Sequence, residues 1–265
     1  MTVNGWNMGQ SAARNQLLAA LPEKDLTLLS PAMELVSFEP EQTIIEPFAA
    51  ITHVHFLQSG LLSVIARSGD REQAEIAMIG REGMAGFSLA LGCSSAPFHI
   101  FVQRAGNALR MSAEAFRQAC HDSPALHRAV LLYSHVFMTQ VAETSRANAR
   151  HTVETRLARW LLMAHDRSDG DDLPLTHEFL SLMLGVRRPG ITVSLHVLEG
   201  ERMIRARRGN IRILDRAKLE QAARGSYGLP EAEYRRLMKP SPAEATAAPP
   251  ANRSGPYYSE ARPAL

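Results

Sequence analysis

The sequence contains very little cysteine and no long apolar run. Its 265 residues include only two cysteines, Cys93 and Cys120. Two thiols cannot build a disulfide framework, nor a zinc or iron–sulfur site that takes all four ligands from cysteine. No stretch approaches the ~20 consecutive apolar residues of a membrane span, and residues 1–10 lack the basic and apolar segments of a signal peptide. We therefore expect a cytoplasmic protein without a metal site, an Fe–S cluster or contact with a membrane.

The sequence also lacks the residue patterns of an active site. It shows no nucleophile paired with a general base, no paired carboxylates and no phosphate-binding loop with its lysine. An enzyme needs some such group, so we expect a protein that is not an enzyme. Apolar residues make up 45% and charged residues 21% of the chain, which is ordinary globular composition. The length predicts about two domains.

The formal net charge of +2 is distributed unevenly along the chain. Residues 1–150 hold 11 basic and 13 acidic residues, which sum to −2. Residues 187–218 hold 9 basic and 3 acidic residues, which sum to +6. A basic segment of this kind is the electrostatic footprint expected of a nucleic-acid-binding face. The alternative is a solvated arginine-rich surface.

Two patterns divide the chain before this basic segment. Between residues 44 and 110, short apolar runs alternate with frequent turn residues, which predicts many short strands in a β-sandwich or barrel-like roll. From residue 125 to residue 169 there is no glycine or proline, and apolar residues recur every three or four positions. This predicts an amphipathic helix over 125–150.

The apolar stripe of this helix has nearly the 3.5-residue repeat of a two-helix seam. It therefore predicts that two copies of the chain pair along the helix. The alternative is that the stripe packs only on the roll of its own chain. The residues of the predicted dimer seam are Leu126, Val130, Tyr133, Phe137 and Val141.

A helix-turn-helix pattern follows a loop at residues 169–174. Thr176 can cap a first helix, and Gly185 can end it because glycine readily adopts a left-handed conformation. A second helix is predicted over 187–198, with Pro189 tolerated in its first turn. In such a pair the second helix enters the major groove, with its first residues at the base edges.

A basic hairpin follows the second helix. Residues 203–214 alternate apolar residues with arginines around a Gly209-Asn210 turn, which predicts a wing that grips phosphates. A further amphipathic helix, which Thr152 can cap, is predicted before the loop at 169–174. On this helix we expect one of Arg156 and Arg159 to form an internal salt bridge and the other to reach phosphate. The predicted base contacts are Arg188, Thr192, Val193 and His196. The predicted phosphate contacts are Arg187, Thr176, Arg205, Arg207 and Arg208.

These segments resemble the Crp/Fnr family of bacterial transcription regulators. The matching stretches are TRLARWLL at 155–162, LTHEFL at 175–180, MLGVRR at 183–188, IRILD at 211–215 and the glycine-bounded IGREGMAG at 79–86. The resemblance implies an α+β fold with a cyclic-nucleotide-binding-like β-roll (a double-stranded β-helix), a long dimerisation helix and a C-terminal winged helix-turn-helix. It implies a homodimer that binds a pseudo-palindromic site on double-stranded DNA and also contacts RNA polymerase.

The expected domain organisation follows from the patterns and the resemblance together. The six prolines and seven alanines among residues 240–265 favour disorder in the tail. We expect a flexible N-terminus at 1–14, a sensor roll at 15–123, the dimerisation helix at 124–150, the DNA-binding domain at 151–224 and a largely disordered tail at 225–265.

The roll departs from the family's nucleotide-binding pattern. Met84 stands where the resemblance places a glutamate that binds the ribose, while Phe98 and His99 replace an Arg–Ser pair that binds the phosphate. Burying a phosphate without the arginine would cost several kcal/mol. We therefore expect no cyclic nucleotide or other cofactor. Any effector should be uncharged and apolar, in a pocket formed by Met84, Phe87, Phe98 and His99. The alternative is that these residues only fill the core of the roll, with His99 as a buried histidine whose hydrogen bonds are satisfied.

A second function fits the same domains. The chain could be a small-molecule sensor that acts through protein partners and carries a vestigial DNA-binding domain. The intact basic segment argues against this alternative, and binding to random duplex DNA distinguishes the two.

Overall fold

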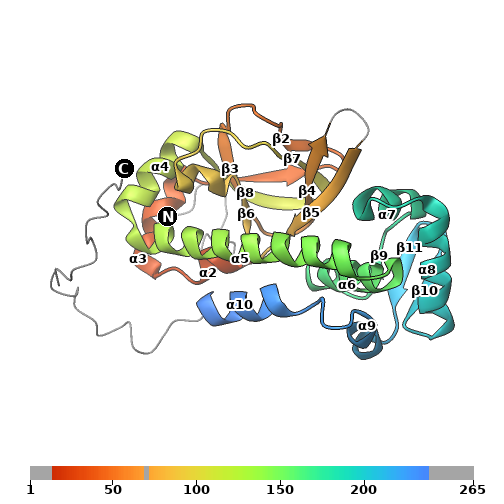
Figure 1. The fold of residues 1–265 in the computed structure, drawn as a ribbon. Helices are drawn as coiled ribbons and strands as arrows, with labels where there is room; N and C mark the ends of the chain where they lie inside the picture. Colours follow the sequence, from red (N-terminus) through yellow and green to blue (C-terminus); the bar gives the residue numbers. More distant parts are fainter. Residues whose placement is uncertain (1–13, 69–71, 239–265) are drawn as a thin grey trace, which may run out of the picture.

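The computed structural model describes residues 14–68 and 72–238 (Figure 1). The described chain begins with helices α2 (Gln16–Ala19) and α3 (Glu23–Leu29) and the 3-10 turn η1 (Ser30–Ala32). Of the flexible N-terminus expected at 1–14, only Arg14 belongs to the described residues.

Two antiparallel four-stranded sheets form the roll, with strand orders β1-β8-β3-β6 and β2-β7-β4-β5. This confirms the β-roll expected from the short apolar runs and frequent turns. The strands are β1 (Glu34–Phe38), β2 (Thr43–Ile45), β3 (His53–Leu57), β4 (Leu61–Ser68), β5 (Glu72–Ile79), β6 (Met84–Ala85), β7 (His99–Arg104) and β8 (Gly106–Ser112), with turn η2 (Phe87–Leu91) and helix α4 (Ala113–Asp122) completing the domain.

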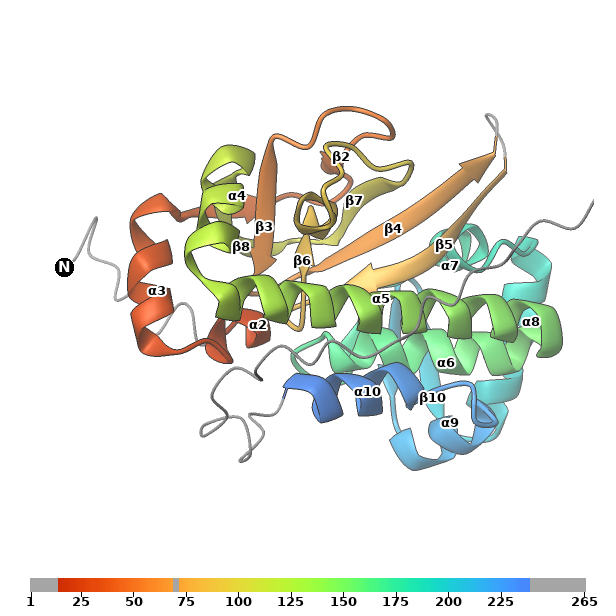
Figure 2. The same cartoon turned by 60° about the vertical axis from the view of Figure 1, so that its left-hand side comes forward.

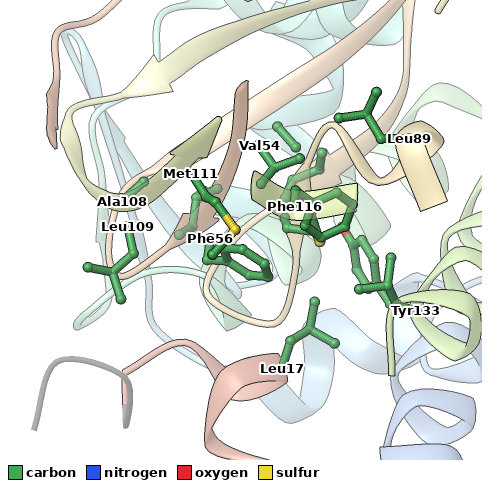
Figure 3. Close-up of a cluster of buried hydrophobic side chains, with 14 of the residues drawn as sticks. Leu17, Val54, Phe56, Leu89, Ala108, Leu109, Met111, Phe116 and Tyr133 are labelled. Atoms are coloured by element: carbon green, nitrogen blue, oxygen red, sulfur yellow. The ribbon is translucent and has the colours of Figure 1, made fainter. Parts of the chain in front are cut away.

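Inward-facing side chains of both sheets fill the roll (Figure 3). Phe56 of β3 and Phe116 of α4 are fully buried, with their ring centroids 6.3 Å apart. Leu17 of α2 approaches the same cluster from one side, and Tyr133 of the long helix approaches it from another (Figure 3). The long helix is therefore part of the roll's core.

Helix α5 (Pro124–Arg150) is the long helix that the sequence predicts, and it runs along the whole length of the roll (Figure 2). The side chains assigned to the dimer seam lie in the core between α5 and the roll of the same chain: Leu126, Val130, Tyr133 and Phe137 are buried there, and Val141 packs at its edge. The seam prediction is therefore wrong. The apolar stripe is already covered within one chain, as the alternative interpretation has it.

A second stripe on α5 remains exposed. Leu131 is 40% and Met138 is 63% exposed, although both are large apolar residues. They belong to a series of exposed positions spaced alternately by three and four residues, which is the spacing of a coiled-coil seam. This outer stripe consists of Arg128, Leu131, His135, Met138, Ala142, Ser145 and Ala149.

The C-terminal half is a winged helix-turn-helix at one end of the molecule (Figure 1). A three-stranded sheet of order β10-β11-β9 packs with the helices around a second core. Its elements are α6 (Val153–Asp166), β9 (Asp172–Leu173), α7 (His177–Leu184), α8 (Arg188–Gly200), β10 (Ile204–Arg207), β11 (Asn210–Ile213) and α9 (Arg216–Ala222).

A last helix, α10 (Leu229–Met238), lies within residues 225–265 and corrects the expectation of disorder for its own ten residues. It lies beside α5 (Figures 1 and 2). Tyr234 and Met238, four residues apart, pack against the core of the roll and α5. Glu233 accepts a hydrogen bond from His135 at 3.2 Å. The helix is stabilised because α5 buries its apolar side. The rest of the predicted tail, residues 239–265, lies outside the described residues.

Polar contacts join the roll to the DNA-binding domain. Trp160 of α6 donates its indole N–H to Oε1 of Glu75 on β5 at 2.7 Å. Arg167 pairs with Glu82 at 2.7 Å, and Arg81 pairs with Asp169 at 2.8 Å. Burial raises the pKa of Glu75 to about 7, because loss of hydration disfavours the charged carboxylate more than its hydrogen bond with Trp160 and the nearby arginines favour it. A carboxyl group that ionises near neutral pH is thus part of the domain interface.

Glu75 should make stability depend on pH. Its pKa rises from 4.5 to about 7 on folding, so its contribution is fully present below pH 4.5 and is lost as the pH rises through about 7. Between about pH 5 and about pH 8, the free energy of unfolding should fall by about 2–3 kcal/mol more in the wild type than in Glu75→Gln, which stays neutral. Urea unfolding at both pH values measures this difference, and equal pH dependence in the two proteins would contradict it.

Candidate nucleic-acid interface

The helix-turn-helix is built from the two local signals that the sequence shows. Thr176 caps α7, and its hydroxyl accepts a hydrogen bond from the amide of Phe179 at 3.1 Å. Gly185 ends α7 with φ +61°, in the left-handed region that favours glycine. Helix α8 then begins at Arg188, with Pro189 in its first turn. The buried residues Ile191, Leu195 and Leu198 hold α8 on the C-terminal core.

The outer face of α8 presents a mixed set of side chains. Arg188, Val193 and His196 are exposed as predicted, and Val193 is 58% exposed despite its apolar character. Thr192 is half-buried, its hydroxyl donates to the carbonyl of Arg188 at 3.2 Å and it lies 3.0 Å from Nδ1 of His177. The threonine is thus partly engaged within the domain. Val197, one turn beyond Val193, is also exposed and does not belong to the predicted set, although its i+4 spacing was a usable signal.

The wing is the hairpin of β10 and β11, packed beside α8. Glu199 of α8 accepts a hydrogen bond from the amide of Ala206 at 3.0 Å, which ties the hairpin to the helix. The turn residues are Arg208 and Gly209, with φ +74° at the glycine, and Asn210 already pairs with Arg207. The turn is therefore Arg208-Gly209, one residue earlier than the expected Gly209-Asn210.

Strand alternation gathers arginines on the outer face of the wing. Arg205 lies directly opposite Arg212, and Arg207 lies two residues beyond Arg205, so these three residues share one face. The predicted set omits Arg212, although the alternating pattern of β11 could have identified it. Arg212 approaches Asp172 at 3.8 Å and is more than half exposed.

The arginines of this surface are exposed and are not paired with carboxylates of the same chain. Arg187, Arg188, Arg205, Arg207 and Arg208 are all exposed, and none of them makes an ion pair within residues 14–68 and 72–238. Arginine is the side chain best suited to bidentate recognition of phosphate and of guanine. We call these five residues and Arg212 the basic surface. With the exposed face of α8, it has the composition of a duplex-binding surface.

Two other arginines have structural contacts. Arg159 is buried and donates to the carbonyl of Ser226 at 2.9 Å, while Arg156 donates to the carbonyl of Leu184. Both bonds fix backbone groups of the domain. Neither arginine makes an ion pair within residues 14–68 and 72–238, so the expected salt bridge is wrong, whereas a phosphate contact of the partly exposed Arg156 stays a prediction.

The side chains of β7 point alternately to the two faces of the sheet, and this separates the residues of the predicted effector pocket. Met84 is fully buried in the roll's core, and Phe87 and Phe98 pack against that core. His99 points to the other face of the sheet, because its neighbour Ile100 points inward. There His99 contacts the Thr43 hydroxyl at 3.0 Å and Arg67 at 2.9 Å. Its assignment to the interior pocket is therefore wrong.

Aromatic rings occupy the space between the roll and α5. The ring of Phe87 lies 4.8 Å from the ring of Phe137 and 5.6 Å from the ring of Tyr133, centroid to centroid. In the described parts of the chain, no group of three or more His, Cys, Asp or Glu residues is placed to hold a metal ion. None of the helices described combines the length and apolar character needed to cross a bilayer.

Two family models match the chain. A cyclic nucleotide-binding domain matches residues 35–123, and a Crp-like helix-turn-helix domain matches residues 155–222. The second match ends before α10 begins. No curated protein sequence gives a significant match.

Several solved structures share the fold. A Crp/Fnr-family protein from Eubacterium rectale is 20% identical, with a TM-score of 0.62, and the match covers 79% of this chain and 98% of that one. A CRP-family transcriptional regulator from Thermus thermophilus is 20% identical, with a TM-score of 0.61 and coverage of 73% and 98%. FixK2 from Bradyrhizobium japonicum is 13% identical, with a TM-score of 0.63 and coverage of 72% and 96%. At these identities the likeness establishes the fold.

Proposed function

The chain belongs to the Crp/Fnr family of transcription regulators, and we propose that it binds a pseudo-palindromic site on double-stranded DNA as a homodimer. The observation that carries the proposal is the basic surface, whose arginines flank an exposed recognition helix. Neutralising phosphates releases counterions and supplies most of the affinity, and α8 reads base edges in the major groove. An enzymatic activity has no support in this arrangement.

The contacts divide into base-reading and phosphate-binding groups. Arg188, in the first turn of α8, has the position and chemistry for a bidentate contact with guanine. Val193 and Val197 offer methyl groups to thymine, and His196 offers a ring nitrogen. Arg205, Arg207, Arg208 and Arg212 lie on or beside the wing and Arg187 precedes α8, so all five are assigned to phosphates, together with Thr176.

We further propose that the protein acts in the cytoplasm and that its DNA-bound form contacts RNA polymerase. Both the location and the contact with RNA polymerase follow from the proposed role in transcription regulation. The rival function, a sensor with a vestigial DNA-binding domain, gains no support from a basic surface whose arginines are exposed to solvent. Failure of the wild-type protein to select any sequence from a random duplex library would favour that rival.

Replacing Arg188 and Arg207 should affect DNA binding in two different ways. Arg188→Ala should weaken the best site by about 1–3 kcal/mol and relax the preference at one base pair per half-site. Arg207→Ala should weaken all duplexes about equally. It should also lower the slope of log K against log salt by about 0.9 for each phosphate that is no longer neutralised, nearly two for a dimer. Fluorescence anisotropy over a salt series, with the selected site and its single-base variants, measures both effects.

Arg117→Ala is the matched control for these variants. This exposed arginine on α4 lies at the opposite end of the molecule from α8 (Figure 1), and its replacement removes the same charge. It should leave the base preference and the salt slope unchanged. If Arg188→Ala also leaves the base preference unchanged, then α8 is not the reading helix.

We propose that the dimer forms through the outer stripe of α5. The stripe has heptad spacing and two exposed large apolar residues, Leu131 and Met138. Pairing there would bury them and set two DNA-binding domains side by side, with their half-sites about 34 Å apart on DNA.

The double variant Leu131→Glu, Met138→Glu should be monomeric, because two charges per chain would face each other across the seam. Leu91→Glu, at an exposed leucine of η2, should remain dimeric. Light scattering at micromolar concentration measures the mass. A wild-type monomer, or a double variant that remains dimeric, would show that this stripe is not the seam.

We also propose that cyclic AMP does not control this protein. The support is the packing of Phe87 on Tyr133 and Phe137, the burial of Met84, and the absence of an arginine at positions 98 and 99. Calorimetry with millimolar cyclic AMP or cyclic GMP should give no binding heat. Submillimolar binding would mean that the ring cluster opens and that another residue meets the phosphate.

A further inference from the structure

A cavity of about 340 Å³ lies outside the roll's interior, where α5, α6, α9 and α10 meet the loop at residues 80–83. This volume is within the range of small-molecule sites. One wall comes from the roll and α5, and the opposite wall comes from the DNA-binding domain and α10. Since α10 lies beyond the matched helix-turn-helix domain, residues outside that domain complete the cavity.

Two tyrosines that line the cavity have hydroxyl groups without a partner. The hydroxyls of Tyr133 on α5 and Tyr234 on α10 are buried, and neither O–H group has an acceptor within the described chain. The Tyr133 oxygen lies against the backbone of Gly83 and Met84. Tyr133 is only 2% exposed. Burial raises the pKa of both hydroxyls well above the usual value, so both remain protonated. Buried donors without acceptors are costly, and a bound acceptor would remove that cost.

The charges around the cavity sum to zero. Glu82 pairs with Arg167 at 2.7 Å, and Asp166 pairs with Arg216 at 2.7 Å. Glu231 and Arg235, one turn apart on α10, contribute one further charge of each sign. The apolar part of the lining comes from Val136, Phe137 and Pro230. A lining of this kind has no excess charge to attract an anion or a cation.

We propose that this hinge cavity binds a neutral small molecule, which places an apolar body against Val136, Phe137 and Pro230 and hydrogen-bond acceptors at the hydroxyls of Tyr133 and Tyr234. The cavity walls belong to both domains, so an occupant contacts both at once. Occupancy therefore changes the position of the DNA-binding domain relative to the roll and, with it, the affinity for DNA. This regulatory consequence rests on the proposed function, whereas the binding itself does not.

The binding test uses three isosteric probes of different charge: benzamide, benzoate and benzylamine. In saturation-transfer NMR with the full chain, benzamide should give a signal, and the two ions should give little or none. Val136→Trp should abolish the benzamide signal by filling the cavity. Leu91→Trp, a comparable enlargement at an exposed site in η2, should leave it unchanged.

Removal of either hydroxyl provides a milder test. Tyr133→Phe and Tyr234→Phe delete O–H groups that have no acceptor within the described chain, so both variants should fold with a Tm no lower than that of the wild type. Each should weaken benzamide binding several-fold, as expected when one hydrogen bond is removed. Absence of a benzamide signal in the wild type, an undiminished signal in Val136→Trp, or equal binding of all three probes would overturn the proposal.

Anisotropy measurements with and without saturating benzamide then test the regulatory part. DNA affinity should change at least several-fold in the wild type and not in Val136→Trp. Unchanged affinity would leave DNA binding intact but show that this cavity does not control it. A protein that binds benzamide but no DNA would instead overturn the proposed function.

Discussion

The burial of one face of α5 in the roll is the contact on which the rest of the structure depends. Tyr133 and Phe137 complete the aromatic core of the roll. The side-chain amide of Gln140 then bonds both the amide and the carbonyl of Met78, at 2.7 and 3.2 Å, and so attaches the next turn of α5 to β5. Because only two residues lie between the end of α5 and the start of α6, this packing also sets where the DNA-binding domain starts. The outer stripe stays exposed on the opposite face of α5, where we propose that a second chain binds.

The arginines of the chain fall into two groups with different physical roles. Arg167 pairs with Glu82 of the roll, and Arg216 of α9 pairs with Asp166 of α6. Arg159 of α6 donates to the carbonyl of Ser226, in the loop after α9. Within the part of the chain that the structure describes, the basic surface has no such carboxylate partners apart from the long contact of Arg212 with Asp172. Interior arginines need partners because an unpaired buried charge is strongly unfavourable. Exposed arginines on one face have no such need, which leaves them available to phosphate.

The space between the roll and α5 differs in chemistry from the hinge cavity. The space between the roll and α5 holds the rings of Phe87, Tyr133 and Phe137, which offer no charge for a phosphate. The hinge cavity has polar groups from both domains, including Tyr234 of α10. The lining of the hinge cavity comes from both domains, so the ligand that we propose would contact both directly, and coupling between sites requires such contacts to differ between two arrangements of the domains.

The sequence by itself determined those features that local hydrogen bonding and chain conformation control. Thr176 and Gly185 mark the ends of α7, the absence of glycine and proline allows α5 to be continuous, and the alternating 203–214 segment forms the wing. These features follow from caps, left-handed turns and strand periodicity, so a single sequence was sufficient to predict them, along with the exposure of Arg188 and Arg207.

Only the tertiary structure decided what each apolar face packs against. The stripe of Val130 and Phe137 identified a buried face, but periodicity cannot distinguish a roll of the same chain from a second chain. The direction of His99 depended on the exact start of β7, where a shift of one residue reverses the side chain. Helix α10 packs on α5 and the roll through Tyr234 and Met238, and the hinge cavity exists only because segments as distant in the sequence as Gln16 and Arg235 meet there. Such contacts depend on the packing of distant segments, which local sequence patterns do not encode.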